Sequence, residues 1–278
     1  MNVEEARQLA KEKIEELGQE LERGHSETLR AYLAAMAKFP RYSPNNIWLI
    51  LAQAPQSRQV AGFGTWKRLG RYVRKGEHGI AILAPCVKRR NPDGVRAKPK
   101  RDMPAGHEDA DTDEVVVGFR GAYVFDVSQT AGAPLADLAI VAGNPSVYTD
   151  RLKAFVAEYG MVIEYSWRIA PARGACTGKT IVLVPDMPPA EHLSTLAHEL
   201  GHALLHRRDG REGLSRTVRE TEAEAVAFVV CEAIGLESRS SSADYIQLWN
   251  GDVKTLTASL ERVQKTAAQI IAAIGPDV

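Results

Sequence analysis

The chain has 278 residues with 35 basic and 35 acidic side chains, so its formal net charge is zero. Its composition, 45% apolar and 25% charged, is ordinary for a globular protein and excludes a collagen-like or wholly disordered chain. The length favours two domains. No apolar stretch approaches the ~18 residues that cross a membrane, and the charged first segment is unlike a signal peptide. We therefore expect a soluble, cytoplasmic protein of two domains.

The charges are unevenly distributed along the chain. Residues 30–101 hold 16 basic and two acidic side chains, whereas residues 102–150 hold one basic and nine acidic side chains. A block of 72 residues with a net charge of +14 is typical of a nucleic-acid-binding surface. The alternative is a solvated basic face that pairs with the acidic stretch after it.

Apolar residues at helical spacing predict three helices in the first third of the chain, over residues 3–22, 26–38 and 43–53. Residues 88–114 contain almost no apolar side chains, and we expect a mobile loop there. The segment 115–127 suits a pair of strands around Arg120-Gly121. Because strands flank the loop on both sides, we interpret it as an insertion within one domain.

A cluster of Gly, Ala and Pro near residues 131–145 is the predicted domain boundary. Periodicity after it predicts helices and short strands, at 147–159, 161–167, 179–185, 189–206, 215–235 and 253–273. The expected fold class is α+β, with a mixed α/β nucleic-acid-binding domain at 1–135. A second domain would span 146–278 and end in a helix.

The segment His198-Glu199-Leu200-Gly201-His202 is an HExxH motif. On a helix, positions i and i+4 lie on one face about one turn apart, so both imidazoles can reach one metal ion. Glu199 is then placed to hold the metal-bound water and take its proton, which makes it the candidate catalytic residue. The alternative is a pair of surface histidines on an amphipathic helix.

A zinc site with two histidines needs a third protein ligand and an open position. The downstream helical segment contains Glu220, Glu222 and Glu224. Glu220 and Glu224 share one face, so we predict Glu220 as the third ligand and Glu224 as a carboxylate that orients a ligating imidazole. Glu222 points away and is expected to face solvent. The cofactor would be one divalent ion, Zn²⁺ first, with Mn²⁺ or another divalent ion as alternatives.

Other residues near the motif have weaker assignments. His206 is expected at the helix C-terminus, where a basic side chain suits the helix dipole. The strand 180–184 is a candidate edge strand to which a peptide could add. Tyr165 or Arg173 is a candidate for polarising a scissile carbonyl.

Aromatic residues interleave with basic residues in the +14 block, a combination that suits single-stranded nucleic acid. We interpret Trp48 and Phe63 as core residues and Trp66, adjacent to Lys67-Arg68, as the better candidate for a residue on which a base stacks. The predicted DNA-binding residues are Arg41, Tyr42, Arg58, Trp66, Lys67, Arg68, Arg71, Arg74 and Lys75.

Three segments, YSPNNIWLILAQAP (42–55), VAGFGTWKRLGRYVRKGEHGIAILAP (60–85) and AYVFDVSQT (122–130), together resemble the N-terminal domain of the ArdC antirestriction proteins. STLAHELGHALLH and ETEAEAVAFVVCEAIGL in the second half resemble the zincin-type metallopeptidase domain of ArdC and of the ImmA/IrrE family. The resemblance implies a single-stranded-DNA-binding N-terminal domain, a metal-binding, protease-like C-terminal domain, and protection of incoming DNA from restriction.

Three functions therefore stay open at this point. The first is an ArdC-like antirestriction protein that coats single-stranded DNA and carries a zinc metallopeptidase-type site. The second is an ImmA/IrrE-type endopeptidase that cleaves a DNA-bound repressor, so that a protein or peptide is its substrate. The third is a DNA-masking protein in which the metal is purely structural.

Overall fold

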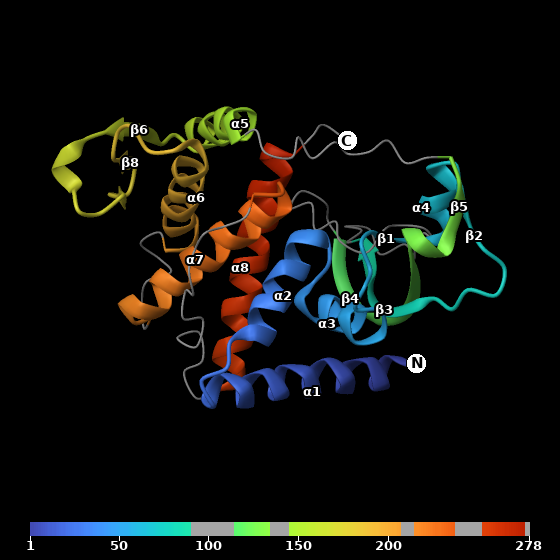
Figure 1. Cartoon of the computed structure of the whole chain (residues 1–278). Helices are drawn as coiled ribbons and strands as arrows, with labels where there is room; N and C mark the ends of the chain where they lie inside the picture. Colours follow the sequence, from blue (N-terminus) through green and yellow to red (C-terminus); the bar gives the residue numbers. More distant parts are fainter. Residues whose placement is uncertain (90–113, 134–144, 207–213, 237–251, 276–278) are drawn as a thin grey trace. The chain divides into compact units, whose positions relative to one another are not determined.

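The computed structural model describes residues 1–89, 114–133, 145–206, 214–236 and 252–275, and the chain forms two compact units (Figure 1). Unit 1 comprises Met1–Ile14 and Arg41–Leu135, and unit 2 comprises Glu15–Pro40 and Ala136–Val278. Residues 15–40, which the predicted first domain includes, therefore pack in unit 2. The predicted loop 88–114 and boundary 131–145 fall mostly outside the described residues.

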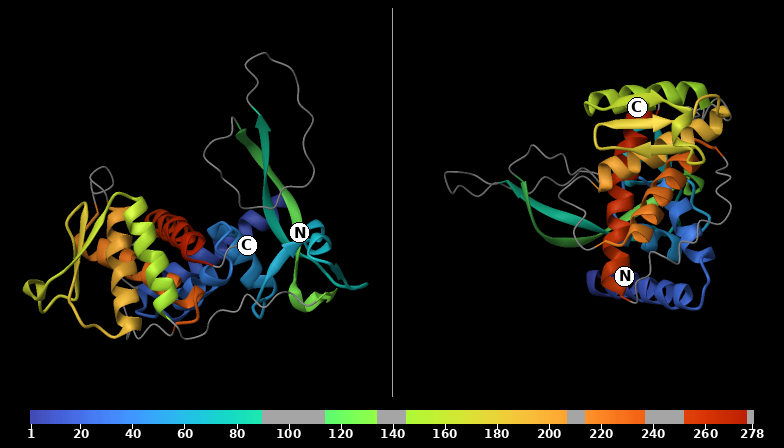
Figure 2. Two further views of the ribbon diagram at one scale, coloured as in Figure 1. Left: turned by 90° about the horizontal axis from the view of Figure 1, so that it is seen from above. Right: turned by 90° about the vertical axis from the view of Figure 1, so that its left-hand side faces the viewer.

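Unit 1 contains small antiparallel sheets with helices beside them. Its elements are the start of α1 (Val3–Glu22), α3 (Pro44–Gln53), β1 (Val60–Gly62), α4 (Phe63–Arg68), β2 (Arg71–Val73), β3 (Ile80–Arg89), β4 (Glu114–Asp126), the 3₁₀ helix η1 (Val127–Gln129) and β5 (Thr130–Gly132). The strand order is β1-β4-β3 in one sheet, and β2 pairs with β5 in the other. Figure 2 shows β3 and β4 as a long twisted ribbon.

The pair of strands predicted around Arg120-Gly121 is wrong, because β4 is one continuous strand of 13 residues. Gly121 pairs with Leu83 of β3 in unbroken register, so no turn interrupts the strand there. The β-branched and aromatic content of the segment is satisfied by one long strand as well as by two short ones.

Helix α3 closes the second edge of β3 with side-chain amides. Asn46 donates to the carbonyl of Leu83 and accepts from its amide, and Gln53 makes the same pair of bonds with Ala81, all at 2.9 Å. These two residues lie seven positions apart, about two turns of the helix, so both amides face β3. The amides thus replace a neighbouring strand and block edge-to-edge pairing along this part of β3.

Unit 2 is mainly helical and holds a three-stranded sheet. Its elements are α2 (Glu27–Lys38), α5 (Pro145–Glu158), β6 (Val162–Tyr165), the 3₁₀ helix η2 (Trp167–Ile169), β7 (Gly174–Cys176), β8 (Thr180–Leu183), α6 (Pro189–Leu205), α7 (Arg216–Ala233) and α8 (Val253–Ile274). The strand order is β6-β8-β7, with β6 parallel and β7 antiparallel to β8. The strand predicted as an edge, β8, is therefore the central one.

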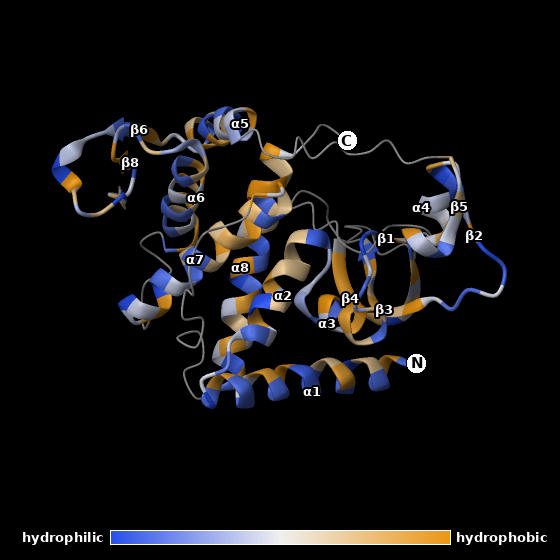
Figure 3. Cartoon of the chain, viewed as in Figure 1, coloured by the Kyte–Doolittle hydropathy of each residue, from blue (hydrophilic) through white to orange (hydrophobic). Residues whose placement is uncertain are grey.

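Helix α2 contributes to the core of unit 2. Leu29, Tyr32 and Leu33 are fully buried, and Arg30 lies over the ring of Phe228 in α7, 5.6 Å from its centre. The apolar and polar residues that alternate along α1 are visible in Figure 3, and Ala6 and Ala10 of its unit 1 part pack with Leu49 and Leu83. None of the helices in the described part of the chain is both long and apolar enough to cross a membrane.

Candidate metal centre

Helix α6 presents the two histidines of the HExxH motif. Its first residue is Pro189, whose fixed φ suits a helix start, and Leu193, Leu196 and Leu200 bury one side of the helix completely. The Nε2 atoms of His198 and His202 lie 3.1 Å apart. One helical turn has therefore brought two metal-binding nitrogens to a common point.

Helix α7 brings Glu220 to the same point. It begins after Ser215, whose hydroxyl accepts a hydrogen bond from the amide of Val218 and caps the helix. Glu220 Oε2 lies 3.2 Å from His202 Nε2 and 3.6 Å from His198 Nε2. One ligand atom from each of the three residues lies within 4.8 Å of the others. Two imidazole nitrogens and one carboxylate oxygen are a donor set that fits a divalent transition-metal ion such as Zn²⁺.

Glu224 contacts the other ring nitrogen of His198, a candidate ligand. Its Oε2 lies 3.1 Å from His198 Nδ1, one turn of α7 beyond Glu220. A carboxylate at this position orients the ring and directs Nε2 toward the metal position.

The carboxylates change the titration of the two histidines. Burial lowers the pKa of His198, but the hydrogen bond to Glu224 and the charges of Glu199, Glu224 and Glu220 outweigh burial, so the pKa is raised above 6.5. Burial, followed by the charge of His198, lowers the pKa of His202 to about 4. Without a metal, protonation therefore favours His198 over its neighbour.

Glu199 lies beneath the edge strand β7. It is 6% exposed, and burial, with the charge of Glu220, raises the pKa of its carboxyl group although His198 acts in the opposite direction. A Cβ atom on Gly174 would lie 2.5 Å from Glu199 Oε1 and 2.8 Å from the Thr195 methyl group. Only glycine lets the strand approach this carboxylate so closely.

The hydrogen-bond register of β7 leaves Gly174 facing outward. The amide of Val184 donates to the carbonyl of Arg173, and the amide of Thr177 donates to the carbonyl of Thr180, both at 2.9 Å. Arg173 and Thr177 therefore direct these main-chain groups toward the neighbouring strand. In an antiparallel pair, residues that bond to the partner strand alternate with residues whose N–H and C=O point away from it. The main-chain groups of Gly174 therefore point to the outer edge of β7, beside Glu199.

Glu222 does not face solvent, which corrects the prediction. It is fully buried, and its Oε1 accepts hydrogen bonds from Nε of Arg262, at 3.2 Å, and from Nη2 of the same guanidinium. Helix α8 covers the face of α7 opposite the histidines, a packing that the periodicity of α7 cannot reveal.

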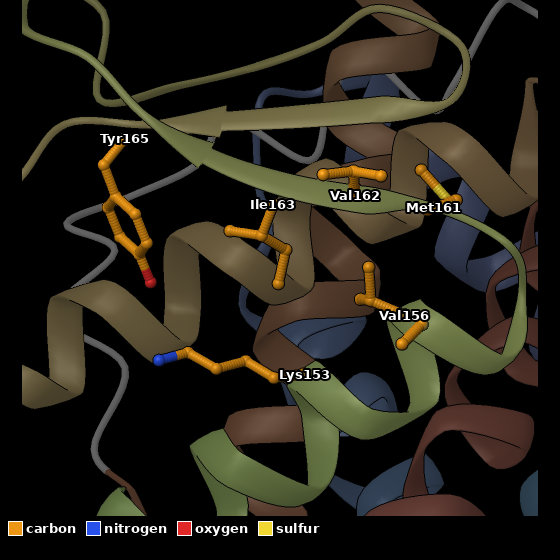
Figure 4. Close-up of a pocket in the computed structure, with 7 residues that line it drawn as sticks. Lys153, Val156, Met161, Val162, Ile163 and Tyr165 are labelled. Atoms are coloured by element: carbon orange, nitrogen blue, oxygen red, sulfur yellow. The ribbon is translucent and has the colours of Figure 1, made fainter.

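Three further residues have structural partners. His206 follows the last residue of α6, as predicted, and its Nε2 lies 3.3 Å from the carbonyl oxygen of Arg219. Arg173 forms an ion pair with Glu191 at 3.2 Å. The Tyr165 hydroxyl lies 3.0 Å from His192 Nε2, at a groove of about 400 Å³ between α5 and β6 (Figure 4). The side chain of Lys153 points toward that hydroxyl in the same groove.

Most of the predicted DNA-binding residues of unit 1 have exposed side chains, and two of the arginines also make hydrogen bonds within the unit. Six of them have exposed side chains, namely Arg41, Arg58, Lys67, Arg68, Arg74 and Lys75. Arg71 is partly buried and bonds to Thr130 and to the carbonyl oxygen of Ala133, and Arg74 bonds to Glu77 and to the carbonyl oxygen of Ser128. These two arginines therefore also hold β2 and the following turn against β5 and η1.

The aromatic assignments need correction. Trp66 is fully buried and its Nε1 donates to the carbonyl of Phe125 at 2.9 Å, so no base can stack on it in this structure. Tyr42 is partly buried and donates its hydroxyl to the Val60 carbonyl at 3.1 Å. Phe63, predicted in the core, is 58% exposed, and Tyr72 is 62% exposed. Trp48 is buried as predicted.

Comparison with protein-family models gives two matches. Residues 7–125 match the N-terminal domain of the anti-restriction factor ArdC, and residues 164–238 match the IrrE N-terminal-like domain of the M78 peptidases. The fold and the site thus define a two-domain protein in which an ArdC-type N-terminal domain precedes an IrrE-like domain. The chain is thus similar to ArdC in its N-terminal half and to the IrrE-like domains in its C-terminal half.

Individual proteins are also similar to this chain. Crystal structures of the antirestriction protein ArdC from plasmid R388, metal-free and Mn(II)-bound, each match with a TM-score of 0.53 at 21% identity. They cover 96% of this chain and 97% or 98% of theirs, and they establish the fold. The uncharacterized protein pXO2-81 of Bacillus anthracis is 28% identical over 85% of this chain. The alignment covers 46% of that relative's own length.

Proposed function

We propose that this chain is an antirestriction protein that binds single-stranded DNA through unit 1 and holds a divalent metal ion in unit 2. The ligands would be His198, His202 and Glu220, with Glu224 orienting His198. The observation that carries this proposal is the convergence of two imidazole nitrogens and a carboxylate oxygen within 4.8 Å. The Mn(II)-bound structure of R388 ArdC, which shares this fold, supports a divalent ion as the ligand.

The unit 2 site has the parts of a peptide hydrolase. A divalent ion held there would polarise a carbonyl and acidify a water molecule. Glu199, whose carboxyl is partly desolvated, is placed to hold that water and take its proton. A peptide in extended form would add to the outer edge of β7, where Gly174 presents its main-chain groups. In this proposal β7, and not the strand 180–184, is the edge strand to which a peptide adds.

Metal analysis of purified protein tests the site. We expect about one divalent ion per wild-type chain, an undiminished content in Glu199→Ala, and a loss in His198→Ala because a ligand is removed. An unchanged metal content in His198→Ala would contradict the ligand assignment.

Glu199→Ala also separates the three functions. If that variant keeps its metal and still protects DNA from restriction, then proteolysis is not the means of protection, and the metal has a structural role. Loss of protection with metal retained supports a hydrolytic role. Cleavage of a DNA-bound repressor by wild type, and not by Glu199→Ala, would favour the regulatory endopeptidase.

For DNA binding, exposed aromatic side chains replace Trp66 in the proposal. Phe63 and Tyr72 lie on α4 and β2, beside Lys67, Arg68 and Lys75. Bases can stack on exposed rings while cationic side chains follow the phosphates. Fluorescence anisotropy with a labelled oligonucleotide should show affinity falling with salt, and each lost phosphate contact should lower the log–log slope by about 0.7.

Matched variants test this surface. Lys67→Ala should lower the slope, whereas replacement of Lys179, an exposed lysine of unit 2, by alanine should leave it unchanged. Tyr72→Ala should weaken binding by about 1–3 kcal/mol with the slope preserved, since stacking releases no counterions. Salt-independent binding would contradict a phosphate-tracking surface.

A further inference from the structure

An ion pair between a buried carboxylate and a partly exposed arginine lies on the side of α7 opposite the metal position. Glu222 is fully buried, and its carboxylate accepts two hydrogen bonds from Arg262 of α8. Arg262 also donates to Ser259 Oγ at 3.0 Å within its own helix. The second carboxylate oxygen of Glu222 lies 3.5 Å from His206 Nε2, at the end of α6. One carboxylate thus connects the three helices α6, α7 and α8.

The position of Glu222 in the sequence gives this pair a geometric consequence. It lies midway between Glu220 and Glu224, and two helical steps rotate a side chain by about 200°. If Glu222 points at α8, its two neighbours must point at α6, where they meet His202 and His198. Rotation of α7 about its axis would withdraw both neighbours from the histidines together.

The energetics hold α7 in this rotation. A carboxylate without solvent contact is costly unless it is paired and hydrogen-bonded, so Glu222 cannot leave Arg262 without a large penalty. His206, which Glu222 also contacts, lies one turn beyond His202 at the end of α6. The pair therefore restrains both helices that carry the ligands.

We propose that Arg262 is a positioning residue of the metal centre, acting through Glu222 to direct Glu220 and Glu224 toward the histidines. This rests on the proposed metal site, and it makes the C-terminal helix α8 part of the centre although none of its residues is a proposed ligand. The predicted effect is on the affinity and coordination geometry of the ion.

The test is Co²⁺ binding to the full-length chain, followed by the visible spectrum and by competition with a chelator. Arg262→Met should bind Co²⁺ about 10-fold more weakly, a loss of the size seen when partners outside the ligand set are removed. Its d–d bands should shift because Glu220 is displaced. Measurements are made at a temperature at which circular dichroism shows each variant folded.

Two further variants separate positioning from general destabilisation. Val263→Ala truncates the next residue of α8, which is fully buried, and leaves the ion pair intact, so its Co²⁺ affinity and spectrum should stay as in wild type. The double variant Glu222→Gln/Arg262→Met removes the buried charge, so it should fold even if Arg262→Met does not, and it should still bind Co²⁺ weakly.

The inference is overturned if either variant that lacks Arg262 keeps the wild-type Co²⁺ affinity and spectrum. It is also overturned if Val263→Ala loses as much Co²⁺ affinity as Arg262→Met. His202→Ala distinguishes this failure from failure of the metal site. If wild type binds Co²⁺ and His202→Ala does not, the site stands, and the Arg262 result bears on positioning alone. If wild type does not bind Co²⁺, both proposals fail.

Discussion

Truncation of Leu33 tests whether helix α2 contributes to the stability of unit 2. The family match places residues 7–125 in one N-terminal domain, yet α2 packs within unit 2, where the Leu33 side chain has no exposed surface. Truncating a fully buried leucine to alanine costs about 3–5 kcal/mol, because transfer energy is lost and a cavity remains. For a unit of this size, each kcal/mol corresponds to about 2–4 °C, so Leu33→Ala should lower the unfolding temperature of unit 2 by about 6–20 °C.

Differential scanning calorimetry of the full chain, with and without Zn²⁺, measures this effect. A ligand that binds only the folded state raises the unfolding temperature, so the metal-sensitive transition identifies unit 2. Leu49→Ala is the matched control, since Leu49 is equally buried in unit 1 and should lower the other transition. The reasoning is refuted if Leu33→Ala leaves the metal-sensitive transition in place or lowers the one that Leu49→Ala lowers.

Three further predictions follow from single contacts. Glu224→Ala should weaken Zn²⁺ binding about 10- to 100-fold in a chelator competition, because His198 loses the carboxylate 3.1 Å from its Nδ1, and unchanged affinity would exclude an orienting role. Zn²⁺ binding should weaken as pH falls through the raised pKa of His198, because the metal binds only the neutral ring. Calorimetry in buffers of different ionisation enthalpy should detect proton release on Zn²⁺ binding below that pKa. Asp126→Ala should destabilise unit 1 by about 2–4 kcal/mol in urea unfolding, since the carboxylate accepts from the amides of Arg58, Gln59 and Ser128. These bonds hold its pKa below the usual value despite burial, so the stabilisation should be present above pH 4 and be lost as pH falls through the lowered pKa.

Local periodicity was sufficient to predict most of the helices and the spacing of the candidate ligands. The i, i+4 spacing of His198 and His202 follows from the helix repeat alone, and so does the shared face of Glu220 and Glu224. The Ser-Pro start of α3 and the double proline before α6 mark helix starts in the same local way. Each of these features depends on residues within a few positions of one another.

Only the tertiary structure determined which side chains of each helix are buried, and against which partners. Periodicity shows that Glu222 points away from the histidines, but only the packing of α8 determines that it meets Arg262 instead of water. Trp66 and Phe63 are three residues apart on one short helix, and their opposite burial depends on β4, whose Phe125 carbonyl accepts from the indole. Likewise, nothing local in residues 15–40 indicates that they pack in unit 2. Sequence alone determined the helices and the ligand spacing, because helix geometry is local, whereas burial depends on partners far along the chain.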